Sequence, residues 1–92
     1  MSKVCTQDIY ESAYFLTLGA NVENVEVLTE NNRLICKFTF SGDNLLQAQN
    51  DYFNAKAVVN LIDFRRCFNR INSLIGTARK EAKQREVIRW KK

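Results

Sequence analysis

The residues with the clearest chemical potential are the cations in the last third of the chain. Ten arginines and lysines lie between residues 65 and 92, and six of them are arginines, which form bidentate hydrogen bonds to phosphates and carboxylates. Polar side chains lie among them, and a tryptophan near the end can stack on an unpaired base or fill a partner's pocket. The sequence therefore predicts a surface that binds phosphates or an acidic protein. Its candidate residues are Arg65, Arg66, Asn69, Arg70, Ser73, Arg79, Lys80, Lys83, Arg85, Arg89 and Trp90.

The charge of the chain is strongly polarised. Residues 1–55 carry three basic and seven acidic side chains, whereas residues 56–92 carry eleven basic and three acidic ones. Such a distribution creates a field that attracts polyanions to one end of the molecule. The same cations could instead do no more than solvate a long helix, so charge alone leaves both interpretations open.

Residue types for catalysis and metal binding are scarce. The chain has no histidine, which removes Ser-His and Cys-His catalysis. Its three cysteines form no Cys-x-x-Cys pair, and its three glycines form no phosphate loop. Cys36 and Cys67 fall at apolar positions, where we expect buried thiols rather than redox groups. We therefore expect a protein that is not an enzyme and holds no cofactor or metal.

Asp8 and Glu11 form a possible carboxylate pair, one helical turn apart. Nothing in the neighbouring sequence would bury these side chains or shift their pKa values. Two acids in the first turn of a helix commonly stabilise the helix dipole, so we interpret the pair as structural.

One long amphipathic helix, from Asn60 to about Arg85, must position the cations. Its apolar residues recur at spacings of three and four, which places them on one stripe of a helix. Asn60 can cap this helix, and Asp63 favours its dipole in the first turn. Gly76 is expected on the exposed side, as a kink or an early end. The predicted stripe is Leu61, Phe64, Phe68, Ile71, Ile75, Ala78 and Ala82.

The remaining elements are shorter. Residues 1–5 read as a disordered or extended lead, and a helix follows from Thr6 or Gln7 to Leu18. Strands are predicted at 22–29 and 33–40, joined by a turn at Asn31 and Asn32, because asparagine tolerates the positive φ of tight turns. Alternating apolar residues of the second strand, Phe38 and Phe40 among them, predict its core face.

Two further segments complete the domain. A helix is expected over 44–54, with Tyr52 and Phe53 either packed in the core or free to stack on a base. The β-branched segment 56–59 is expected to be a brief third strand. The sequence thus predicts a single α+β domain over residues 1–92, with a basic tail from about 85. Its small antiparallel sheet, a hairpin plus a short third strand, packs with three helices, of which the last is long and amphipathic.

Three sequence blocks carry a resemblance to a family of small domains encoded by phages and mobile elements. The blocks are QDIYESAYFLTLGANV, RLICKFTF and VVNLIDFRRCFNRINSLI, and the similarity spans roughly residues 7–75. In that family a helix of the pattern xxYxAxYLLxxG opens the chain, a hairpin follows, and a V-polar-x-x-x-F step opens the last helix. The matching positions here are Ile9, Ala13, Tyr14, Phe15, Leu16, Gly19, Val59 and Phe64.

The chain also resembles phage anti-CRISPR proteins in its length and in its lack of catalytic residues. That resemblance implies an inhibitor of a type I surveillance complex, a host assembly of protein and guide RNA, acting in the host cytoplasm. It implies partners that include guide RNA, possible direct nucleic-acid contact, no membrane, and a monomer or weak homodimer. Two alternatives remain: a small basic phage protein that binds nucleic acid directly, and a self-assembling structural module whose basic face only keeps it in solution.

Overall fold

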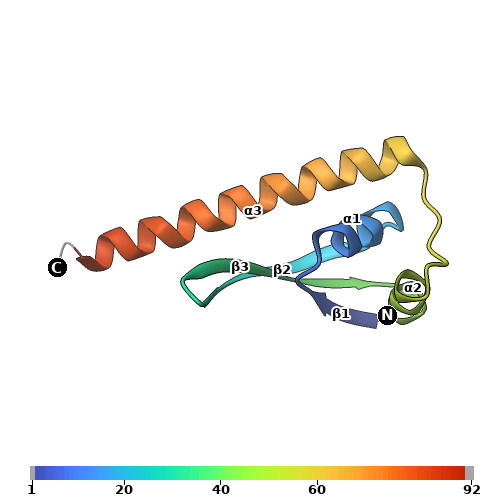
Figure 1. Ribbon diagram of the computed structural model, residues 1–92, viewed down its shortest axis with the longest axis horizontal. Helices are drawn as coiled ribbons and strands as arrows, with labels where there is room; N and C mark the ends of the chain where they lie inside the picture. The colour runs from blue at the N-terminus through green and yellow to red at the C-terminus, as the bar shows by residue number, and fades with distance from the viewer. Residues whose placement is uncertain (1, 91–92) are drawn as a thin grey trace.

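The computed structural model describes the backbone of residues 2–90 and the side chains of residues 2–83. Over this range the chain forms three strands and three helices, and the strands make one antiparallel sheet in the order β1-β3-β2 (Figure 1). This arrangement confirms the predicted α+β fold with a long last helix. In chain order the elements are β1 (Ser2–Thr6), α1 (Ile9–Thr17), β2 (Asn21–Glu30), β3 (Arg33–Gly42), α2 (Leu45–Phe53) and α3 (Leu61–Trp90).

The β2–β3 hairpin forms where the sequence predicts it. Asn31 and Asn32 form its turn with φ values of 51° and 64°, which asparagine adopts more readily than most residues. Along β3 the burial alternates, so that Phe38 and Phe40 are buried while Thr39 between them is only partly covered. Alternate side chains of a strand point to opposite faces, so one face of the sheet belongs to the core.

The third strand comes from the start of the chain. β1 pairs antiparallel with β3, placing Val4 opposite Phe40 and Thr6 opposite Phe38. The prediction of a strand at 56–59 is wrong, because that segment is a connection without strand structure, and Val58 is 87% exposed. Its β-branched residues favour a strand locally, but β1 and β2 already occupy both sides of β3 at residues 38–41.

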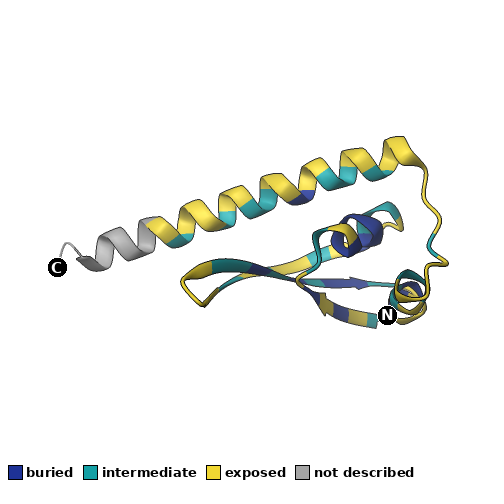
Figure 2. Cartoon of the chain, viewed as in Figure 1, coloured by how far each residue is buried: buried dark blue, intermediate teal, exposed yellow. Residues whose placement is uncertain are grey.

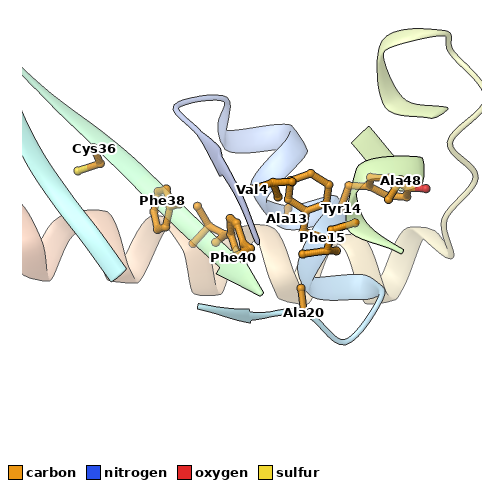
Figure 3. Close-up of a cluster of buried hydrophobic side chains, with 11 residues drawn as sticks. Val4, Ala13, Tyr14, Phe15, Ala20, Cys36, Phe38, Phe40 and Ala48 are labelled. Atoms are coloured by element: carbon orange, nitrogen blue, oxygen red, sulfur yellow. The ribbon is translucent and has the colours of Figure 1, made fainter. Parts of the chain in front are cut away.

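The core lies between the inner face of the sheet and the helices (Figure 2). Phe15 of α1 meets Phe40 of β3 edge to face, with ring centroids 5.5 Å apart. Figure 3 shows side chains of β1, α1, β3 and α2 converging on this cluster. Leu45 of α2 and Ile71 of α3 complete it, both almost fully buried. The core therefore fastens all three helices to one sheet face.

Helix α2 contributes less of its surface to the core than the sequence suggests. Ala48 is buried and Tyr52 is half-buried, but Phe53 is 70% exposed. The prediction of core packing is therefore wrong for Phe53. Its side chain is rotated about 100° around the helix axis from that of Tyr52, away from the side on which Ala48 and Tyr52 face the core. Within the part of the chain that the structure describes, no helix has both the length and the apolarity needed to cross a bilayer.

Candidate polyanion-binding surface

Helix α3 begins at the predicted cap. The side-chain Oδ1 of Asn60 accepts hydrogen bonds from the backbone N–H groups of Ile62, at 3.0 Å, and of Asp63, at 3.1 Å. Asp63 lies in the first turn, where its negative charge favours the helix dipole. The helix continues through Gly76, so the early end considered there does not occur. The ribbon of α3 runs straight, without a kink (Figure 1).

The inner side of α3 attaches the helix to the rest of the domain. Ile71, near the centre of this inner side, is fully buried. An aromatic stack joins α3 to α1, in which the ring centroids of Tyr10 and Phe68 lie 5.4 Å apart. Phe64 stacks in turn on Phe68, with centroids 6.1 Å apart. Leu61 is 76% exposed, so its predicted place in this stripe is wrong; the connection leaves it ahead of the first turn that reaches α1. The apolar stripe thus begins at Phe64.

The outer side of α3 carries the basic face, defined here as Arg65, Arg66, Arg70, Lys80 and Lys83. All five side chains are exposed, as are Asn69 and Ser73, which lie among them. Figure 2 shows this exposed side running along the helix, away from the sheet. At a rise of about 1.5 Å per residue, the basic face extends for roughly 27 Å. Its length and direction suit an extended anionic partner.

The first turns of the basic face are slightly hollowed. Ile62, Arg65, Arg66 and Asn69 line a shallow depression. Ile62 is 52% exposed and gives the depression an apolar element beside two guanidinium groups. Ile62 is not among the residues predicted to bind a partner, although its spacing of four from Arg66 places both side chains on one side of the helix.

Arg79 differs from the other nominated arginines. Its Nη2 donates a hydrogen bond of 3.1 Å to the backbone carbonyl of Leu34 in β3. The side chain is therefore directed toward the sheet and does not belong to the basic face. Arg85, Arg89 and Trp90 lie outside the residues whose side chains the structure describes.

The carboxylate pair near the start of α1 is not what the sequence suggested. Glu11 is only 1% exposed, and its Oε2 has no hydrogen-bond partner among the described residues. Burial raises the pKa of Glu11, with a smaller contribution from the charge of Asp8, and hydrogen bonds from Thr6 and Gln49 oppose the shift. The expectation that neither acid would be buried or shifted is wrong for Glu11, because α2 and β1 close over it.

Asp8 has a structural role, as predicted. Its Oδ1 accepts the backbone N–H groups of Tyr10 and Glu11, which caps α1. Its Oδ2 accepts the hydroxyl of Tyr52 at 2.7 Å, which ties α2 to α1. Burial, together with this hydrogen bond, raises the pKa of Tyr52 to about 12. One carboxylate therefore joins two helices across 44 residues of sequence.

The three cysteines are separate free thiols. Cys36 is buried and Cys67 is half-buried, in agreement with their predicted apolar surroundings, while Cys5 is exposed. Among the described residues, no group of three or more cysteine, aspartate or glutamate side chains is placed to hold a metal ion.

Comparison with protein-family models, with curated proteins and with solved structures found no match to this chain. Among the residues described above, the basic face of α3 is the strongest candidate for a functional site.

Proposed function

We propose that this protein is a non-enzymatic phage inhibitor that acts in the host cytoplasm on a type I CRISPR surveillance complex. The basic face of α3 would dock on the complex of protein and guide RNA and stop target DNA from pairing with the guide. The observation that carries the proposal is the division of α3 into two sides. Ile71 holds the helix to the domain, while Arg65, Arg66 and Arg70 remain exposed.

The division matters because binding does not require the domain to open. The aromatic stack of Tyr10, Phe68 and Phe64 holds the inner side before any partner arrives. Prior ordering of the helix reduces the entropy lost on association. Guanidinium groups presented by a rigid helix can then form charge-assisted hydrogen bonds to phosphate or carboxylate oxygens.

The alternative is a small basic phage protein that binds nucleic acid directly through the same cations. It is favoured by the alignment of exposed cations along one side of α3, which matches a phosphate backbone as well as it matches a protein surface. Ile62 favours the inhibitor, because an exposed isoleucine inside the basic depression suits a partner surface with apolar as well as anionic groups.

The decisive experiment compares ligands and charge variants. Binding of the purified protein to an assembled type I complex, to its free guide RNA and to duplex DNA would be measured at several salt concentrations. An inhibitor binds the complex far more tightly than free nucleic acid, whereas a direct nucleic-acid binder shows no such preference and loses affinity steeply with salt.

The charge variant is the triple reversal of Arg65, Arg66 and Arg70 to glutamate. At roughly 1 kcal/mol per lost contact, it should weaken binding by about a hundredfold. Lys3→Glu is the control, since Lys3 is exposed on β1 and lies outside the basic face. Undiminished binding and inhibition by the triple variant, with its fold intact by circular dichroism, would remove the basic face from the mechanism.

A further inference from the structure

One stretch of the sheet has a strand on one side only. β1 pairs with residues 38–42 of β3, whereas β2 pairs along β3 as far as Arg33. Among the described residues, the segment from Arg33 to Lys37 therefore has β2 on one side and no strand on the other. We call the second side the open edge of β3. An edge of this kind is a template for another extended chain.

The backbone groups at the open edge can be assigned from the register. The two-residue turn closes on the pair Glu30 and Arg33, and in an antiparallel ladder alternate residues bond to opposite neighbours. Ile35 therefore bonds toward β2, while Leu34 and Cys36 direct their N–H and C=O groups to the open edge. The hydrogen bond from Arg79 to the Leu34 carbonyl agrees with this assignment, because it reaches β3 from outside the β2 ladder.

A cleft lies along the open edge. It has a volume of about 240 Å³, and its lining includes Gln7, Ile9, Ile75 and Arg79 beside the strand itself. Ile9 and Ile75 come from α1 and α3, so the helix side of the cleft is apolar. An extended chain placed there would satisfy backbone groups and bury apolar side chains against these isoleucines.

The charged side chains of β3 favour an acidic segment at the open edge. On the face away from the helices, Glu26 lies opposite Lys37 and Glu30 lies opposite Arg33. A strand added at the open edge would have Lys37 and Arg33 as its cross-strand neighbours, where acidic side chains stabilise and basic ones repel. A second copy of the same segment would bring arginine and lysine against arginine and lysine, which disfavours self-pairing.

We propose that the open edge of β3 binds an extended acidic segment of a partner protein, added to the sheet beyond the end of β1. Alternate side chains of the segment are apolar and pack toward Ile9 and Ile75. The intervening ones are acidic and face Arg33 and Lys37. This surface is separate from the basic face of α3, and it stands or falls independently of the proposed inhibitor function.

The test uses a synthetic peptide of about eight residues that alternates glutamate and valine, a typical strand length. Two matched versions carry N-methyl groups on alternate amides, one on each edge of the peptide. With isotope-labelled protein, the unmodified peptide should shift the amide signals of Leu34 and Cys36. It should also slow hydrogen exchange at Cys36 by about tenfold, the effect of roughly 1.4 kcal/mol.

Only one N-methylated version should retain binding, because the hydrogen bonds to β3 use a single edge of the peptide. Equal binding by both versions, or shifts confined to α3, would overturn the proposal. A concentration-dependent dimer that protects the same amides without peptide would also overturn it, in favour of a second copy of this chain.

Protein variants supply an independent readout. Arg33→Gln and Lys37→Gln combined should weaken peptide binding by about tenfold, from roughly 0.7 kcal/mol for each cross-strand charge pair. Lys3→Gln and Lys56→Gln combined are the matched control and should leave peptide binding unchanged, since both lysines are exposed and lie outside the cleft and the basic face. Equal weakening by the control would show general charge attraction and refute the strand addition. The N-methylated peptides decide the matter with unaltered protein if the double variant folds poorly.

Discussion

Two isoleucines of α3 provide a matched test of the helix's two sides. Ile71 is fully buried at the centre of the inner stripe, whereas Ile62 is 52% exposed on the outer side. The same substitution, isoleucine to alanine, can be made at each position. Because the chemical change is identical, any difference in stability reports the environment of each side chain.

The expected losses follow from burial. Isoleucine to alanine removes a methyl and an ethyl group, and these contribute about 2.4 kcal/mol when fully buried. At Ile71 the residual cavity raises the cost to about 3–4 kcal/mol. At Ile62 about half of that burial contribution is lost, because the side chain is about half exposed. The better helix propensity of alanine offsets about 0.4 kcal/mol, so the free energy of unfolding should fall by less than about 1 kcal/mol.

Urea unfolding followed by circular dichroism measures both losses. With an m-value of about 1 kcal/mol/M, the midpoint of Ile71→Ala should lie roughly 2 M or more below that of Ile62→Ala. Ile71→Ala should keep the exposed cations of α3 and hence its partner binding at low urea. Equal losses at the two positions would refute the two-sided helix and with it the basis of the proposed docking face.

Three further substitutions test the fold around this helix. Tyr52→Phe removes the hydroxyl that donates to Asp8 and should lower the free energy of unfolding by about 1.5–3 kcal/mol, as measured in urea. Burial raises the pKa of Glu11, so the folded protein binds the proton of this carboxyl more tightly than the unfolded chain does. The free energy of unfolding therefore falls as the pH rises from about 4, the pKa of an unfolded glutamate, through the raised pKa of the folded state. The thermal midpoint of Glu11→Gln should therefore change less with pH over that window than the midpoint of the natural protein. Identical pH dependence of the two midpoints would contradict a raised pKa for Glu11. Gly76→Ala should raise the free energy of unfolding by about 0.5–1 kcal/mol, because no atom lies within 4 Å of the added methyl group and alanine favours a helix interior.

Local patterns were enough to predict the hairpin and the start of the last helix. The positive φ values of Asn31 and Asn32 and the cap at Asn60 depend on residues adjacent in sequence. The alternation of β3 likewise predicts its buried face, since a strand's period is a property of the backbone. These features require little knowledge of the rest of the chain.

The strand partners could not be found in the same way. β1 has only five residues, and its pairing with β3 joins segments more than thirty residues apart. Segment 56–59 contains two β-branched valines, yet it lies outside the sheet. Propensity describes how well a residue fits a pleated surface, whereas membership in a sheet requires a free edge within reach.

The candidate site likewise has some features that local patterns predict and others that depend on tertiary packing. The helical period placed Arg65, Arg66 and Arg70 on the outer side of α3, and the structure leaves them exposed. The period could not show that Arg79 reaches Leu34, because that contact depends on how α3 lies over β3. It also could not show that Glu11 is buried.

The sequence by itself determined where the chain turns, where the last helix starts and which side of that helix is basic, because these depend on local backbone geometry and on a regular period. Only the tertiary structure decided that β1 completes the sheet, that Glu11 loses its contact with water and that part of β3 keeps an open edge. Each of these outcomes is set by packing between segments distant in the chain, which no short-range pattern encodes.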